Sequence, residues 1–236
     1  MENYQNEISA QRTLDRSVAS TLMRSVYYWM AGALAITGLT AMLVANNPAL
    51  LNFLFSSPTL VWGLLIGEIV LVLILSAAIN RLSFSTATLL FILYSVVNGV
   101  TLSSIFVVYT QGSIASTFFI TAGMFGGLAL YGSVTKKDLS GMGRFLFMTL
   151  IGLIIASIVN IFMHSEMLYW ITTFVGVLVF AGLTAWDAQK IQQMALMADD
   201  VNESTQKMAL LGALTLYLDF INLFLYLLRI FGSRRD

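Results

Sequence analysis

The chain has 236 residues, of which 58% are hydrophobic and only 10% are charged. Soluble domains carry about 25% charged residues, so the composition excludes an ordinary soluble protein and a disordered one. The 12 basic residues balance the 12 acidic ones, which leaves no positive excess for binding nucleic acid. The absence of Cys and the presence of a single His exclude disulfides, thiol catalysis and a His-based metal site.

The chain begins with a polar segment of mixed charge, which we interpret as a cytoplasmic tail over residues 1–24. Seven long apolar runs follow it, at residues 26–45, 60–79, 87–109, 114–134, 145–163, 167–186 and 208–231. Each run has the roughly 20 residues that a helix needs to cross a bilayer. Only three charged residues, Glu68, Asp219 and Arg229, lie inside the runs. The pattern predicts an all-α polytopic membrane protein with a seven-helix domain over residues 25–232 and a short tail over residues 233–236.

The distribution of Lys and Arg predicts a cytoplasmic N-terminus, because basic residues favour the cytoplasmic loops. With that orientation, the inner segments carry nine basic residues and the three outer loops carry none. The nine are Arg12, Arg16, Arg24, Arg81, Lys136, Lys137, Arg144, Lys190 and Lys207. Seven crossings place the C-terminal tail outside, although Arg234 and Arg235 would favour the inside. The alternative is six crossings and a re-entrant last segment; we favour seven, because a lipid-exposed break would leave backbone groups unsatisfied.

Two aspartates are candidates for function, because carboxylates inside a membrane are costly. Asp219 lies about eleven residues into the last run, and its nearest basic neighbour in the run, Arg229, is ten residues away. We therefore expect Asp219 to be protonated, paired with another helix or facing water. Asp187 follows the sixth run, where it either forms an interfacial helix end or approaches Asp219. Two adjacent carboxylates would share a proton, and their oxygens would also suit calcium.

Three further charged residues are candidates for a supporting role. Glu68 and Arg229 are predicted at the same depth in the outer half of the membrane, so they suit an ion pair that either locks two helices or contributes to transport. Arg81 ends the second run on the inner side, at the level of Asp187. It is either a positive-inside anchor or a latch on the carboxylate pair.

Enzyme signatures are missing, so we expect no enzyme activity and no required cofactor. The chain has no phosphate-binding loop, no dinucleotide-binding glycine pattern and no Gly-x-Ser-x-Gly elbow. An intramembrane aspartyl protease could use two aspartates, but it usually carries them in a Gly-x-Gly-Asp context. Neither Asp187 nor Asp219 has that context.

Three segments resemble the Bax inhibitor-1 family, and in particular its bacterial inner-membrane, YbhL-like branch. They are Leu216-Tyr217-Leu218-Asp219-Phe220-Ile221-Asn222-Leu223-Phe224 with the following Leu228–Gly232, Thr135-Lys136-Lys137-Asp138-Leu139-Ser140, and Trp186-Asp187-Ala188-Gln189-Lys190. The resemblance implies a seven-helix fold in the inner membrane with the last helix central in the bundle. It also implies a pH-sensitive calcium leak, in which Asp187 and Asp219 match the di-aspartyl sensor and Glu68 and Arg229 match a membrane ion pair.

Two other functions stay open at this point. The protein could be a non-conducting interaction protein that modulates a membrane protease or a stress response, or it could be a proton-coupled transporter. The expected partners are the lipid bilayer, calcium and protons. If the protein is an interaction protein, a membrane protease is an expected partner as well.

Overall fold

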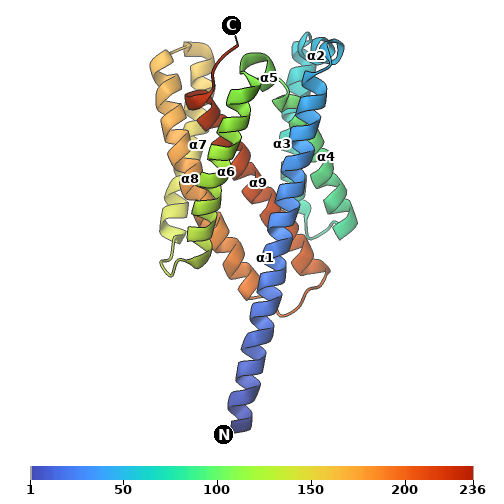
Figure 1. Cartoon of the computed structure of the whole chain (residues 1–236), viewed down its shortest axis with the longest axis vertical. Helices are drawn as coiled ribbons and strands as arrows, with labels where there is room; N and C mark the ends of the chain where they lie inside the picture. Colours follow the sequence, from blue (N-terminus) through green and yellow to red (C-terminus); the bar gives the residue numbers. More distant parts are fainter. Residues whose placement is uncertain (1, 236) are drawn as a thin grey trace. The chain divides into compact units, whose positions relative to one another are not determined.

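The computed structural model describes the backbone of residues 2–235 and the side chains of residues 17–235. The predicted polar tail therefore lies largely outside the residues whose side chains are described. The described chain is helical, with no β-strand between residues 2 and 235. Its helices are α1 (Glu2–Ala45), α2 (Pro48–Phe55), α3 (Pro58–Ala78), α4 (Phe84–Leu102), α5 (Ile105–Val108), α6 (Gln111–Val134), α7 (Ser140–Met163), α8 (Glu166–Leu196) and α9 (Glu203–Phe231) (Figure 1).

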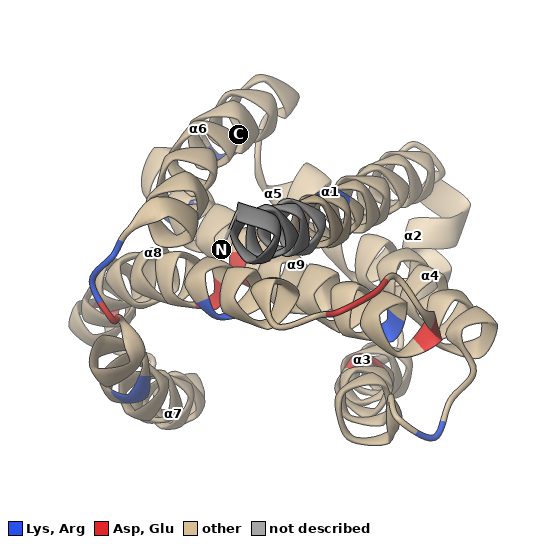
Figure 2. Cartoon of the chain, turned by 90° about the horizontal axis from the view of Figure 1, so that it is seen from below, with Lys and Arg blue, Asp and Glu red and all other residues tan. Residues whose placement is uncertain are grey.

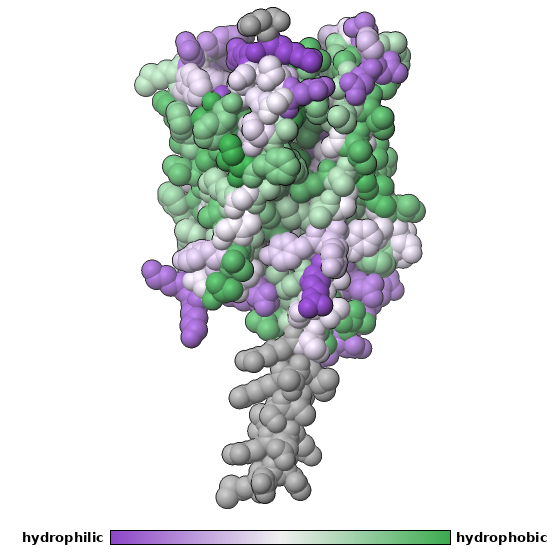
Figure 3. Space-filling model, in the orientation of Figure 1, coloured by the Kyte–Doolittle hydropathy of each residue, from purple (hydrophilic) through white to green (hydrophobic). Residues whose placement is uncertain are grey.

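Seven of the described helical stretches are long and apolar enough to span a membrane, which confirms the all-α, seven-helix prediction. They are α1, α3, α4 together with α5, α6, α7, α8 and α9. Along these helices, hydrophobic side chains cover the middle portions and hydrophilic ones gather toward the ends (Figure 3). The charged positions likewise concentrate in connections and at helix ends (Figure 2). The orientation of the N-terminus stays a prediction.

Several helices begin at a residue whose side chain satisfies the free backbone N–H groups of the first turn. Asn47 accepts a hydrogen bond from Leu50 N at 3.1 Å and starts α2, which the apolar runs did not predict. Ser83 and Thr110 cap α4 and α6 in the same way. The short helix α2 thus arises from local capping, which a search for membrane-length runs does not detect.

Helix α8 extends well beyond its apolar run. It continues past Trp186 to Leu196, and the connection to α9 shrinks to residues 197–202. The extension is rich in Ala, Gln, Met and Leu, which are good helix formers. It also buries one face, since Ala188, Ile191 and Ala195 recur at helical spacing. Asp187 therefore lies inside a helix, and the prediction that it forms a helix end is wrong.

The chain divides into two compact units. The first consists of Met1–Val108 with Ile191–Leu214, and the second consists of Tyr109–Lys190 with Thr215–Asp236. Helices α8 and α9 contribute residues to both. In the apolar stretch of α9, 67% of the residues are buried, against 6–44% of the residues in the other spans. Its central position in the complete bundle stays a prediction.

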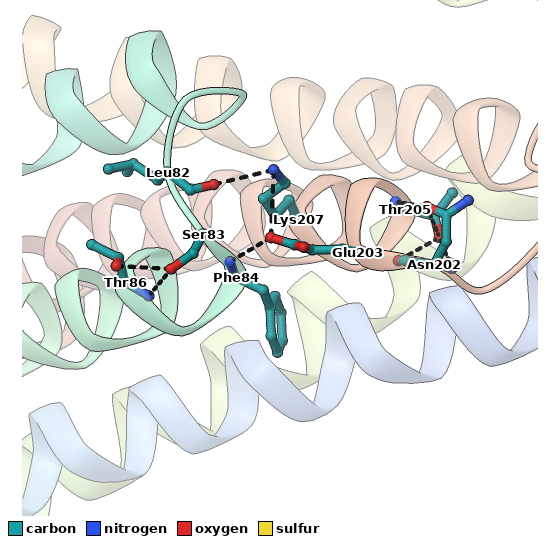
Figure 4. A network of polar contacts seen from close by, with 8 residues as sticks. All are labelled: Leu82, Ser83, Phe84, Thr86, Asn202, Glu203, Thr205 and Lys207. Carbon is teal, nitrogen blue, oxygen red and sulfur yellow. Dashed lines mark hydrogen bonds and ion pairs between the residues drawn. The ribbon is translucent and has the colours of Figure 1, made fainter.

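In the first unit, polar contacts fix α1 and the first turns of α9. Thr37 Oγ1 donates to Ser95 O at 2.9 Å and links α1 to α4. The start of α9 holds the α3–α4 connection, because Lys207 Nζ donates to Leu82 O at 3.1 Å and Glu203 Oε1 accepts from Phe84 N at 3.0 Å (Figure 4). These contacts satisfy backbone groups that the connection leaves unpaired.

In the second unit, glycines let helices lie directly against α8. A Cβ atom at Gly132 would collide with the backbone of Ala185, and one at Gly143 would collide with the ring of Trp186. The backbones of α6 and α7 therefore approach α8 too closely for any larger residue at these two positions. This packing fixes the segment of α8 that carries Asp187.

Candidate functional site

The side chains of Asp187 and Asp219 meet in the second unit. Asp187 is on α8 and Asp219 is on α9, and their carboxyl groups are hydrogen-bond partners. Both residues are buried, at 8% and 5% exposure. Because a carboxylate has no donor hydrogen, a hydrogen bond between two carboxyl groups requires one proton. The arrangement can therefore bind a proton between two helices.

Asp219 occupies a position that the helical pattern would assign to an apolar residue. Leu216 and Leu223 share its face of α9, and both are buried. One oxygen of Asp219, Oδ2, is buried without a hydrogen-bond partner in the described part of the chain. Because an unpaired buried polar atom is costly, this oxygen is available to a proton, a water molecule or a cation.

Both aspartates line a cavity of about 880 Å³ between α7, α8 and α9. The volume lies within the range of small-ligand sites. Much of the wall is apolar, as at Leu150 and Ile154 on α7, and Asn222 and Thr215 of α9 add polar groups. The cavity offers space for water or an ion beside the carboxyl groups.

Two basic residues also line this cavity, and both lie against aromatic rings. Lys190 Nζ is 5.4 Å from the ring centre of Trp186. The Arg229 guanidinium is 5.3 Å from the ring centre of Tyr169 and 5.0 Å from that of Tyr226. Neither Lys190 nor Arg229 forms an ion pair within 4.0 Å with a carboxylate of the described residues. Within the described residues of this unit, both basic residues of the cavity therefore lack a carboxylate partner.

The remaining candidates belong to different units. Glu68, in the first unit, accepts a hydrogen bond from Asn98 Nδ2 at 3.1 Å, whereas Arg229 belongs to the second unit. Arg81 is exposed in the α3–α4 connection of the first unit. The Glu68–Arg229 ion pair and the latch role of Arg81 stay predictions.

The donor set suits a weakly held hard cation more than a permanent metal. No group of three or more His, Cys, Asp or Glu side chains in the described part of the chain could hold a metal ion. Calcium takes 6–8 oxygen ligands, so two carboxylates would supply only part of its shell. Water and the amide and hydroxyl oxygens of the wall would have to supply the rest.

Gln189 and Lys190 belong to the family-like segment at residues 186–190, but the sequence analysis gave neither a role beside the aspartates. Gln189 is 5% exposed; its Nε2 donates to Lys137 O at 2.7 Å and its Oε1 accepts from Leu139 N at 2.9 Å. It thereby fixes the α6–α7 connection against α8. The available signal was helical spacing, since Lys190 follows Asp187 by three residues and so shares its face.

Comparison with known proteins gives matches along most of the chain. The Bax1-I family model, "Inhibitor of apoptosis-promoting Bax1", matches residues 19–236. The inner membrane protein YbhL of Escherichia coli K12 is 53% identical over 221 residues, which cover 93% of this chain and 94% of the relative. An uncharacterized protein of Borreliella burgdorferi is 45% identical over 219 residues, with 93% and 94% coverage. An uncharacterized membrane protein of Streptococcus pyogenes serotype M1 is 38% identical over 191 residues, with 81% and 82% coverage.

Proposed function

Because the chain belongs to the Bax inhibitor-1 family of membrane proteins, we propose that it is a pH-sensitive calcium leak channel of the inner membrane. In this proposal Asp187 and Asp219 form the gate. The observation that carries the proposal is the hydrogen bond between these two buried carboxyl groups, which come from different helices and line one cavity. The similarity to YbhL supports the location in the inner membrane.

A shared proton would hold the gate closed. With the proton in place, the hydrogen bond draws α8 and α9 together at the cavity wall. Loss of the proton leaves two negative charges close together, which repel by about 4 kcal/mol at 4 Å and an effective dielectric near 20. Such a repulsion can shift an equilibrium between two helix packings by roughly two to three orders of magnitude. The leak should therefore increase as the pH rises.

Calcium would take the place of the proton between the two carboxylates. The ion brings the positive charge that the ionised pair lacks, so protons and calcium compete for one site. The other charged groups that face the cavity are Lys190 and Arg229. Both are basic; Lys190 is three residues from Asp187, whereas Arg229 is ten residues from Asp219.

Calcium flux into liposomes that contain the purified protein tests this function. We expect the flux through the wild-type protein to rise with pH and the flux through Asp187→Asn and Asp219→Asn to lose that dependence. Asp138→Asn is the matched control: Asp138 is exposed in the same unit, and hydrogen bonds from Ser140 hold its pKa below the usual 3.8. This control should keep the wild-type profile.

Three outcomes would contradict the proposal. Wild-type pH dependence in both single variants would remove the aspartates from the gate. No flux in the wild-type protein, with retained binding to a membrane protease, would favour the interaction protein, and uptake against a calcium gradient would favour the proton-coupled transporter.

A further inference from the structure

We propose that Lys190, an exposed residue at the cavity that lies against the ring of Trp186, is a counter-ion of the Asp187–Asp219 pair that sets how weakly the pair binds calcium. This inference rests on the proposed function, because it names the residue that determines the cation affinity of the same site. Neither the spacing of the apolar runs nor the placement of the aspartates assigns this role to Lys190.

The first support is the position of the Lys190 ammonium. Lys190 follows Asp187 by three residues on α8, and both residues line the cavity, Asp187 buried and Lys190 exposed. The charge of Lys190 acts on the Asp187 carboxyl group. The ammonium nevertheless forms no ion pair within 4.0 Å with a carboxylate of the described residues. The positive charge therefore lies beside the pair without being bound to it.

The second support is the way in which Trp186 is fixed. The α7 backbone at Gly143 lies directly against the indole, where a Cβ atom would collide with the ring. The ammonium of Lys190 lies 5.4 Å from the ring centre, within the range of a cation–π interaction. Because α7 holds the ring in place, the cation–π contact favours one position of the ammonium beside the cavity.

This arrangement makes the site bind a divalent ion weakly enough for the ion to dissociate. A fixed positive charge near two carboxylates opposes the binding of a second cation and shortens the time for which it stays. Conduction requires binding that is weak enough to allow release. The remaining basic group of the cavity wall, Arg229, is ten residues along α9 from Asp219, or about 15 Å. At that distance its charge is largely screened in physiological salt.

Equilibrium binding of radioactive calcium to the purified full-length protein in detergent tests the inference. We expect Lys190→Gln to bind calcium about tenfold more tightly than the wild-type protein, because the opposing charge is gone. Lys190→Arg keeps the charge and the contact with the ring, so its affinity should stay within twofold of wild type. Lys136→Gln is the matched control, since Lys136 is exposed in the same unit and does not line the cavity.

Trp186→Leu supplies a second, independent readout. Without the ring, the ammonium is free to move onto Asp187, so calcium binding should weaken. In Trp186→Leu combined with Lys190→Gln, the loss should disappear, because no ammonium remains to compete. If Trp186 has only a structural role, Trp186→Leu should lower the calcium affinity equally in the wild-type protein and in Lys190→Gln. Thermal melting of each variant reports whether the fold is intact.

The outcomes separate this inference from the proposed function. Equal calcium affinity in the wild-type protein and Lys190→Gln, including no measurable binding by either, contradicts the role of Lys190. If Asp187→Asn and Asp219→Asn still abolish binding in that case, the proposed site stands without its counter-ion. If Lys190→Gln binds more tightly and the aspartate variants bind like wild type, calcium is held elsewhere, and both proposals are wrong.

Discussion

At the scale of single residues, Gln189 shows how a buried amide can position a site without taking part in its chemistry. Gln189 follows Asp187 by two residues on α8. Its side-chain amide forms hydrogen bonds with the backbone of Lys137 and Leu139. Nothing in the local sequence distinguishes it from the exposed Gln193 of the same helix. The contact depends on where the α6–α7 connection folds back, which composition and periodicity do not encode.

Replacement of Gln189 by Leu should destabilise the protein by about 1–3 kcal/mol, because Lys137 O and Leu139 N would lose their partner. Gln193→Leu, at an exposed position of α8, is the control and should change stability by less than about 0.5 kcal/mol. Thermal or denaturant unfolding in detergent measures both. Equal stability of the two variants would mean that the Gln189 contacts are replaced by water at no cost.

At the scale of elements, the existence of the seven long helices follows from the apolar runs, but their ends do not. The runs stop where polar residues begin, whereas α8 continues through Gln189 and Lys190 to Leu196 because its sequence still favours a helix and still buries one face. That extension places Asp187 inside the packed part of the helix. The sequence could identify Asp187 and Asp219 as costly carboxylates, but the contact between them depends on the packing of α8 against α9.

Close packing of α7 on α8 predicts different effects for two glycines of one helix. Gly143→Ala should destabilise the protein by about 1–3 kcal/mol, since the new methyl group would collide with Trp186. Gly141→Ala should be neutral or slightly stabilising, because no atom lies within 4 Å of its added Cβ and alanine favours the helix. Thermal unfolding compares them, and a stabilising Gly143→Ala would contradict the close approach of α7.

At the scale of the whole molecule, the two units divide the charged residues that the sequence had grouped. Glu68 has Asn98 as a partner in the first unit, and Arg229 lies on the rings of Tyr169 and Tyr226 in the second. The sequence could place Glu68 and Arg229 at one depth in the membrane, because helical rise fixes depth. It could not decide whether they meet, since depth says nothing about which helices are neighbours.

A double-mutant cycle tests the predicted Glu68–Arg229 pair. If the two groups are partners, Glu68→Gln and Arg229→Gln should each destabilise the protein by about 1 kcal/mol, because Arg229 is exposed and Glu68 is only half-buried. The double variant should then recover part of the loss. Additive losses within about 0.5 kcal/mol would show that the two residues act independently.

The proposal that one proton and one calcium ion compete for Asp187 and Asp219 is tested most directly by proton release. Calcium is added to the purified protein in weakly buffered detergent, at a pH at which the pair still holds its proton. Because a cation displaces the proton of its ligands, the wild-type protein should release about one proton for each calcium ion bound, and Asp187→Asn and Asp219→Asn should release none. Calcium binding without proton release, or equal release by the wild-type protein and both variants, would contradict the shared site.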